Sequence, residues 1–257
     1  MTKMLIKIGG AMLDDAAART AISRQLAEAH RTNPMLAVVH GGGKQMTRFL
    51  EERGVASEFI DGLRVSSPPV IDAVLKIFAG TVNHELVSSL VASGLDAVGL
   101  SGIDCALTEC EIVDPALGQV GRPVRANTRI LDTLCADGFV PVIACVGGDR
   151  RGNIYNVNAD QMATSLAAAW GVGRLLFLTD VEGVRGSDGQ RIPILRRHEA
   201  NELIETGVAT GGMLAKLRAA EFALSSGVGE VRIVHGATPN VLVRVQSGEA
   251  LGTAFVP

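Results

Sequence analysis

Two short apolar segments of this chain each lead into a group of glycines. The first is Met4–Ile8, followed directly by Gly9 and Gly10. The second is Leu36–Val39, followed after one residue by Gly41–Gly43. Short apolar runs of this kind predict buried strands, and glycines at their ends let backbone N–H groups approach an anion without a Cβ in the way. The chain is therefore predicted to carry an anion-binding site where strands end.

Strand-like and helix-like segments alternate along the chain. This alternation predicts an α/β fold, a three-layer αβα sandwich around a mainly parallel sheet. The glycine groups would lie at the carboxyl edge of that sheet, where open α/β sheets bind ligands. The predicted strands are Met4–Ile8, Leu36–Val39, Ala97–Leu100, Val140–Val146, Leu175–Leu178 and Val231–Val234. The predicted helices are Ala16–His30, Gly43–Arg53, Pro69–Ser93, Ile130–Asp137, Asp160–Trp170, His198–Glu205 and Met213–Ser226.

One region interrupts the alternation. Residues 104–125 mix charges, glycine and proline with short alternating apolar pieces, a pattern that favours a small β-hairpin or flap. No linker, low-complexity tract or internal repeat divides the chain. We expect one domain over residues 1–257, with an N-terminal lobe (1–172) and a C-terminal lobe (173–257) that meet near Gly171–Gly173.

The composition argues against several classes of protein. The 257 residues are 47% hydrophobic and carry a net charge of −3, and no dense lysine or arginine run indicates nucleic acid or an anionic membrane as partner. The N-terminal residues lack a signal-peptide pattern, and the most apolar region, 166–178, is too short and too interrupted to span a bilayer. Four cysteines without a CxxC pair favour buried thiols over zinc or disulfides, and a cytoplasmic location.

Standard nucleotide-binding signatures are missing. Gly43-Lys44-Gln45 lacks the Ser/Thr and the upstream glycine of a Walker loop, and no G-x-G-x-x-G follows a strand. Lys7 lies inside an apolar strand, where an unpaired buried ammonium is costly. Its side chain therefore either extends to solvent from a strand end or binds an anion, and the adjacent glycines favour the anion.

A carboxylate and a second lysine lie near predicted helix starts. Asp160 falls in the first turn of a helix that Asn158 can cap, a placement that is common for structural reasons alone. Lys216 is expected in the first turn of the helix Met213–Ser226, where its charge opposes the helix dipole unless both share an anion. Glycine loops, two lysines and one carboxylate are parts from which a phosphoryl-transfer site can be built.

Together and in this order, these segments resemble the amino acid kinase family. The resemblance covers essentially the whole chain. It is nearest to the branch that uses ATP to phosphorylate the side-chain carboxylate of N-acetyl-L-glutamate, forming an acyl phosphate in arginine biosynthesis. No single block is decisive, but their joint occurrence is specific. The blocks are residues 6–10, 39–43, 61–65, 156–161, 178–184, Gly211–Met213 with Lys216, and 252–253.

The resemblance implies a role for each block. Lys7 and Lys216 would flank the transferring phosphoryl group, and Asp160 would hold both lysines. The acyl substrate would bind the N-terminal lobe and ATP the C-terminal lobe, with Mg²⁺ arriving on the nucleotide rather than in a metal site of the protein. The phosphate-binding residues would be Gly9, Gly10 and Gly41. The acyl-substrate residues would be Gly42, Gly43, Arg64 and Asn156, the last two on the α-carboxylate. The nucleotide-binding residues would be Asp180, Val181, Gly183, Val184, Gly211 and Met213.

Two alternatives to this function stay open. One is a related kinase for N-acetylaminoadipate or another N-blocked amino acid, and the other is a catalytically silent amino-acid sensor of the same fold. The joint presence of Lys7, Asp160 and Lys216 disfavours the sensor. Arginine-inhibited members of the family carry an extra N-terminal helix that links dimers into a ring, whereas the first strand here starts at Met4. We therefore expect a homodimer without arginine inhibition.

Overall fold

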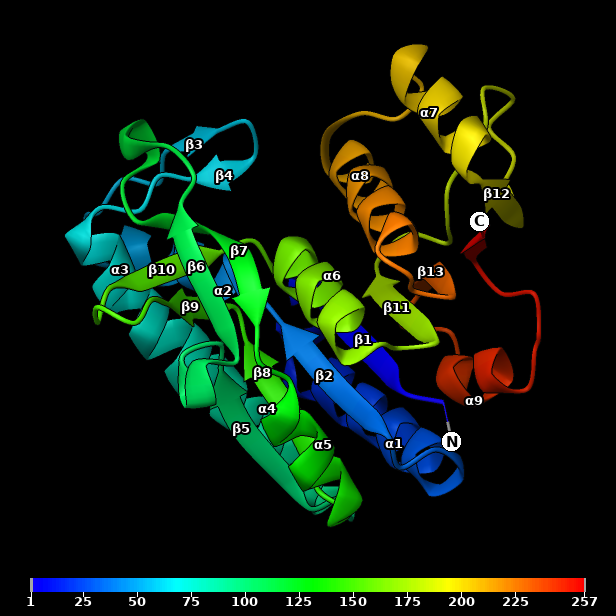
Figure 1. Cartoon of the computed structure of the whole chain (residues 1–257), viewed down its shortest axis with the longest axis horizontal. Coiled ribbons are helices and arrows are strands. Elements are labelled where there is room, and N and C mark those ends of the chain that lie inside the picture. Colours follow the sequence, from blue (N-terminus) through cyan, green and yellow to red (C-terminus); the bar gives the residue numbers. More distant parts are fainter. Residues whose placement is uncertain (1, 257) are drawn as a thin grey trace.

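The centre of the molecule is an eight-stranded sheet, seen in a computed structural model that describes residues 2–256 (Figure 1). Its strands are β1 (Met4–Ile8), β2 (Leu36–His40), β5 (Ala97–Ser101), β8 (Val140–Ala144), β11 (Arg174–Thr179), β12 (Ile194–Arg196), β13 (Glu230–His235) and β14 (Thr253–Val256). They pair in the order β12-β14-β13-β11-β1-β2-β8-β5. All neighbours are parallel except β13 and β14, which confirms the predicted mainly parallel sheet.

Helices cover both faces of this sheet. They are α1 (Ala16–Thr32), α2 (Gly43–Glu51), α3 (Pro68–Val74), α4 (Asn83–Ala92), α5 (Arg129–Ala136), α6 (Ala159–Trp170), α7 (Arg197–Glu205), α8 (Gly211–Ser225) and α9 (Val241–Gln246). Helix α1 packs beside α4 and α9 on one face, and α6 packs beside α8 on the other (Figure 1). Because the sheet is covered on both sides, β1 and β2 are buried along their whole length, as their mainly apolar sequences predict.

Three central strands end side by side at the carboxyl edge. Ile8 at the end of β1 pairs with His40 of β2 on one side and with Leu178 of β11 on the other. The loops that follow these strands therefore start next to one another. They carry the glycines 9–10, the glycines 41–43 and the segment 180–184.

A second, smaller sheet forms where a flap was expected. Strands β6 (Thr108–Ile112), β7 (Val120–Ala126), β9 (Val146–Gly148) and β10 (Ile154–Val157) close into a barrel. The predicted hairpin exists as β6–β7, but it belongs to this barrel and is not a free flap. The predicted strand Val140–Val146 is correspondingly divided, because the chain leaves the central sheet after Ala144 and pairs with β10 from Val146 onward.

The helix predicted over Pro69–Ser93 contains an irregular middle. Residues Leu75–Val82 form a π-helical segment between α3 and α4. Helical periodicity in a sequence indicates the apolar face but cannot reveal one wide turn, so the prediction was right in extent and wrong in regularity. The C-terminal elements β12, β14 and α9 were not predicted, because segments of three to six residues carry little periodic signal.

Candidate active site

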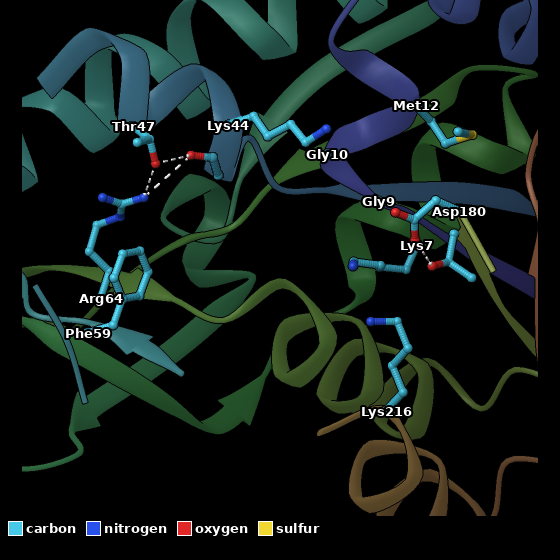
Figure 2. A pocket seen from close by; sticks show the side chains of 12 residues that line it. Lys7, Gly9, Gly10, Met12, Lys44, Thr47, Phe59, Arg64, Asp180 and Lys216 are labelled. Atoms are coloured by element: carbon cyan, nitrogen blue, oxygen red, sulfur yellow. Dashed lines mark hydrogen bonds between the residues drawn. The ribbon is translucent and has the colours of Figure 1, made fainter. Parts of the chain in front are cut away.

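Two lysines from opposite sides of the site meet at one carboxylate. The Nζ atom of Lys7, on β1, lies 2.7 Å from Oδ1 of Asp160, and the Nζ atom of Lys216, on α8, lies 3.6 Å from Oδ2. The three side chains are only 11 to 17% exposed. Figure 2 shows the amino groups of Lys7 and Lys216 next to each other. Two ammonium groups and one carboxylate leave a net positive charge, which a bound anion would balance.

The start of α6 holds Asp160 in place. The Asn158 side chain accepts hydrogen bonds from the backbone N–H groups of Asp160 (2.9 Å) and Gln161 (3.2 Å), and so caps the helix as predicted. Burial by itself would raise the pKa of the Asp160 carboxyl, but the charges of Lys7 and Lys216 outweigh burial and lower that pKa. The carboxylate therefore stays ionised and orients both lysines.

The helix that carries Lys216 begins earlier than predicted. Helix α8 starts at Gly211, which has a φ of +52°. Lys216 is therefore in the second turn, and the expectation that its ammonium opposes the helix dipole from the first turn is wrong. The carboxylate of Asp160 accounts for its buried position instead.

The two glycine groups lie next to each other, and one of them packs tightly against a helical segment. A Cβ on Gly42 would lie 2.9 Å from Cδ1 of Phe78 and 3.2 Å from Cγ2 of Val82, both in the π-helical segment. A Cβ on Gly10 would lie 3.6 Å from the backbone nitrogen of Gly43, so the two glycine groups are neighbours. This close approach explains why a loop between a strand and a helix needs glycine at position 42.

A buried histidine supports the second glycine loop. His40 contacts the carbonyl oxygen of Gly41 through Nδ1 (2.8 Å) and the Nδ2 atom of Asn83 through Nε2 (2.9 Å). Since the Asn83 amide nitrogen is a donor, Nε2 accepts and Nδ1 carries the proton. Burial lowers the pKa of His40 to about 4, so the ring is neutral. A neutral ring with both nitrogens hydrogen-bonded makes His40 a supporting residue of the loop rather than a catalytic base.

Arg64 and Asn156 are brought to the same cavity by different elements. Arg64, in the hairpin of β3 (Phe59–Ile60) and β4 (Leu63–Arg64), is 8% exposed and donates from Nη2 to Oγ1 of Thr47 (2.7 Å). Asn156, on β10, donates to Ser66 Oγ (3.0 Å), and that hydroxyl donates to the Arg64 carbonyl (2.8 Å). The Arg64 guanidinium also packs over the ring of Phe59, at 4.5 Å from its centroid. The contacts with Thr47 and Phe59 fix the orientation of the Arg64 guanidinium.

Two adjoining cavities share a wall at the lysine cluster. One has a volume of about 410 Å³ and the other about 210 Å³. Both are lined by Lys7, Gly10, Gly43, Phe59 and Arg64. A molecule in one cavity and a molecule in the other would therefore meet beside Lys7.

The remaining lining residues separate the two cavities. Lys216 and Asp180 line only the larger one, together with Lys44 from α2 (Figure 2). Gly41, Gly42 and Asn156 line only the smaller one. The predicted acyl-substrate residues thus gather around the smaller cavity, and residues from both halves of the sheet enclose the larger one.

The segment predicted to bind nucleotide is only partly directed at the larger cavity. Asp180 lines it, whereas Val181 is exposed and lies outside the lining. Val184 is buried, and its backbone N–H donates to Oγ1 of Thr253 (2.8 Å). A Cβ on Gly183 would lie 2.6 Å from that same oxygen. Gly183 and Val184 therefore pack the loop against β14, and neither residue lines the larger cavity.

The last two predicted nucleotide residues belong to the start of α8. Gly211 is exposed and Met213 is half-buried, and neither lines the two cavities. Five residues that line the larger cavity were not predicted: Met12, Lys44, Thr47, Phe59 and Thr179. Lys44 could have been predicted from the sequence, because it directly follows three glycines. No sequence feature indicated Thr47 or Phe59, because their role depends on the tertiary position of Arg64.

Potential metal ligands do not cluster in residues 2–256, and only one of the four cysteines there is accessible. No group of three or more His, Cys, Asp or Glu side chains there could hold a metal ion. Cys110, Cys135 and Cys145 are buried as predicted, and burial raises the pKa of each to about 12. Cys105 is exposed, contrary to that prediction. No helix in this part of the chain is long and apolar enough to cross a membrane.

The parallel sheet and the lysine pair at its carboxyl edge define an α/β protein suited to hold a phosphoryl group between two cavities. Residues 2–235 match the model of the amino acid kinase family, and the chain belongs to this family. Acetylglutamate kinase of Solibacter usitatus is 55% identical over 99% of this chain and 99% of its own length. Acetylglutamate kinase of Rubrobacter xylanophilus is 42% identical over 98% and 96%.

A solved structure extends the comparison to the fold. N-acetylglutamate synthase from Neisseria gonorrhoeae, crystallised with coenzyme A and N-acetyl-glutamate, superposes with a TM-score of 0.89 at 23% identity. The match covers 100% of this chain and 59% of the synthase. At that identity the likeness concerns the fold alone, and it agrees with the predicted αβα sandwich.

Proposed function

We propose that this chain is an ATP-dependent kinase that phosphorylates the side-chain carboxylate of N-acetyl-L-glutamate, forming an acyl phosphate in arginine biosynthesis. The observation that carries the proposal is the cluster of Lys7, Asp160 and Lys216, in which Lys7 lines both cavities and Lys216 lines the larger one. The names of the two relatives described above support the choice of substrate.

In this proposal the substrate supplies its own nucleophile. The side-chain carboxylate of N-acetyl-L-glutamate is ionised at neutral pH, so the reaction needs no strong base. One of its oxygens attacks the γ-phosphorus of ATP, the bond to the bridging oxygen breaks, and ADP leaves with the electron pair. Phosphoryl transfer depends mainly on alignment and on stabilising charge. Lys7 and Lys216 supply that charge, and backbone N–H groups of the glycine loops supply further donors.

The smaller cavity suits the acyl substrate. Arg64 presents a planar guanidinium that can hold a carboxylate through two parallel hydrogen bonds, and Asn156 adds an amide on the same side. Glycines 41–43 leave room for the chain of the substrate to pass toward Lys7. The N-acetyl glutamate skeleton would thereby be fixed at one end and open to attack at the other.

The larger cavity is assigned to the phosphates of ATP. Lys216 on α8 and Asp180 after β11 reach it from the C-lobe proposed for residues 173–257, and Lys7 and Lys44 reach it from the N-lobe proposed for residues 1–172. Asp160 already pairs with two ammonium groups, so Mg²⁺ would arrive on the nucleotide, and Asp180, the carboxylate that lines the larger cavity, would be available to bind it. The homodimer expected from the comparison with the family and the cytoplasmic location expected from the cysteines complete the proposal, and light scattering of the purified protein checks the dimer.

A hydroxamate assay tests the proposed activity. The purified protein, ATP, Mg²⁺ and hydroxylamine are incubated with N-acetyl-L-glutamate, N-acetyl-L-aminoadipate and other N-acyl amino acids. We expect the acyl phosphate to form fastest from N-acetyl-L-glutamate, and Lys216→Ala to remove nearly all of it. Preference for aminoadipate would move the assignment to the related kinase. No turnover, combined with measurable amino-acid binding, would indicate a sensor.

A further inference from the structure

Lys44 is an unpaired cation beside the phosphoryl-transfer site. The chain has five lysines. Lys3 pairs with Asp132, Lys76 pairs with Asp72, and Lys7 and Lys216 share Asp160. Within residues 2–256, no carboxylate lies within 4.0 Å of the Lys44 amino group. Its charge is therefore free to meet a ligand.

The local structure makes this position unfavourable without a ligand. Lys44 is the second residue of α2, so its positive charge lies in the first turn, beside the positive end of the helix dipole. Figure 2 shows its side chain extending from α2 toward Gly10. An anion between the two would offset both the lysine charge and the free N–H groups of the helix start.

The lining of the two cavities indicates which substrate that anion belongs to. Lys44 lines the larger cavity with Lys7 and Lys216, and it does not line the smaller one that holds Asn156 and Gly42. Arg64 borders both cavities, and in the proposed function it binds the α-carboxylate of the acyl substrate. Lys44 is thus the exposed, unpaired cation on the N-terminal side of the larger cavity.

We propose that Lys44 is a further catalytic residue, which binds the terminal phosphate of ATP from the N-terminal side, opposite Lys216. This inference rests on the proposed function in one respect, namely that the phosphates of ATP occupy the larger cavity. The Lys44 ammonium makes no covalent bond. It neutralises charge on the phosphoryl oxygens while the group moves from ADP to the acyl carboxylate, and its flexible stem follows that movement.

Nucleotide binding in the absence of acyl substrate tests the inference. Calorimetric titration with Mg²⁺ compares Kd for ATP, ADP and AMP in the parent, Lys44→Gln and Lys44→Arg. We expect Lys44→Gln to weaken ATP binding about tenfold or more, the loss of one charged contact, and to leave AMP binding unchanged. Lys44→Arg should recover most of the ATP affinity. Lys76→Gln is the matched control, an exposed lysine paired elsewhere, and should behave as the parent does.

Stability and kinetics give two independent readouts. The melting temperature of Lys44→Gln should equal or exceed that of the parent, because a charge opposing the helix dipole has been removed. Its kcat should fall, while KM for N-acetyl-L-glutamate stays within about twofold, a free-energy change of less than 1 kcal/mol. Equal weakening of ATP and AMP, unchanged ATP binding, or a selective rise in KM for the acyl substrate would each overturn the inference.

The proposed function and the proposed role of Lys44 can be disproved independently, by different measurements. Acyl-phosphate formation by the parent reports on the proposed function, whereas the ratio of ATP to AMP affinity in Lys44→Gln reports on the residue. A parent that binds ATP but does not phosphorylate N-acetyl-L-glutamate would disprove the first and leave the second measurable. A parent that forms the acyl phosphate with unchanged rate and affinity in Lys44→Gln would disprove only the second.

Discussion

At the scale of single residues, the site depends on one carboxylate that holds two ammonium groups. Asp160→Asn keeps the size of the side chain but removes its charge. The amide cannot hold Lys7 and Lys216 together, and their mutual repulsion would move them from the transferring group. We expect kcat to fall at least about 100-fold, comparable to the loss of one transition-state contact, with KM for ATP much less affected.

Steady-state kinetics and circular dichroism check this prediction. The exposed carboxylate Asp188, outside the two cavities, provides the control substitution Asp188→Asn, which should leave kcat unchanged. If Asp160→Asn kept the parental kcat and lost only thermal stability, the role of Asp160 would be limited to stabilising the start of α6 through the helix dipole.

Arg64 supports a second prediction at this scale. Lysine cannot reproduce the planar fork of a guanidinium, so Arg64→Lys should raise KM for N-acetyl-L-glutamate roughly 10–100-fold. Esterifying the α-carboxylate of the substrate should have a similar effect in the parent and little additional effect in the variant. Such non-additivity indicates a direct contact. Simple addition of the two losses would show that Arg64 does not touch the α-carboxylate.

The sequence predicted these residues unevenly, for physical reasons. An anion partner for Lys7 could be predicted because a charge inside an apolar strand is a local feature. From the sequence alone Asp160 was interpreted only as a residue of the first helical turn, and its role between the lysines was predicted from the family resemblance. The Asp160 contact of Lys216 was predicted from the family resemblance, while the dipole argument for Lys216 failed because the start of α8 was placed two residues late. The role of Thr47 was not readable, because it depends on how the β3–β4 hairpin folds over α2.

At the scale of elements, the second glycine loop depends on what packs beneath it. The π-helical segment brings Phe78 and Val82 against Gly42, and α4 brings Asn83 to His40. The strands β1, β2 and β11 were predictable from short, mainly apolar runs. The π-helical segment and the four-stranded barrel were not, because their irregular turns and short strands follow from contacts between segments distant in sequence.

The buried His40 predicts a pH dependence of stability. Its pKa falls to about 4 in the folded chain from an ordinary value of 6.5, so the unfolded state binds more protons between these two pH values. The contribution of His40 is fully favourable above pH 6.5, and stability is lost as pH falls toward 4, by roughly 3 kcal/mol. The lowered pKa of Asp160 affects stability only below the ordinary carboxyl range.

Urea unfolding at several pH values between 4 and 7 measures this effect. His40→Gln should be less stable than the parent at pH 7 and should show a smaller loss of stability between pH 6.5 and 4.5. His84→Gln, at an exposed position on α4, is the control and should retain the parental slope. An unchanged slope in His40→Gln would show that His40 does not titrate on unfolding.

At the scale of the whole molecule, one continuous sheet carries both cavities, and its halves serve different substrates in the proposal. Strands β1 and β2 lead to the glycine loops, and β11 leads to the segment 180–184. The order of these strands could be anticipated only in part from the sequence. Alternation of strands and helices predicts a parallel sheet, but the antiparallel insertion of β14 between β12 and β13 depends on a C-terminal strand of four residues.

This division predicts that a change in the loop after β11 acts on the nucleotide alone. Gly183 has a φ of +146°, and a Cβ there would lie 2.6 Å from Thr253 Oγ1. Gly183→Ala must therefore displace the loop from β14, and Asp180 with it. We expect KM for ATP to rise roughly tenfold, equivalent to about 1.4 kcal/mol, and KM for N-acetyl-L-glutamate to stay as in the parent. Arg64→Lys should instead raise KM for N-acetyl-L-glutamate and leave KM for ATP as in the parent.

Initial-rate kinetics with each substrate varied in turn tests the division, with Gly189→Ala as the control. Gly189 also has a positive φ, +75°, but a Cβ there meets nothing within 4 Å. Gly189→Ala therefore adds backbone strain without displacing β14, and should lower the melting temperature while leaving both KM values unchanged. Because backbone strain is common to both variants, a rise in KM for ATP confined to Gly183→Ala would come from loop displacement. If Gly183→Ala raised both KM values equally, the two halves of the sheet would not bind their substrates independently.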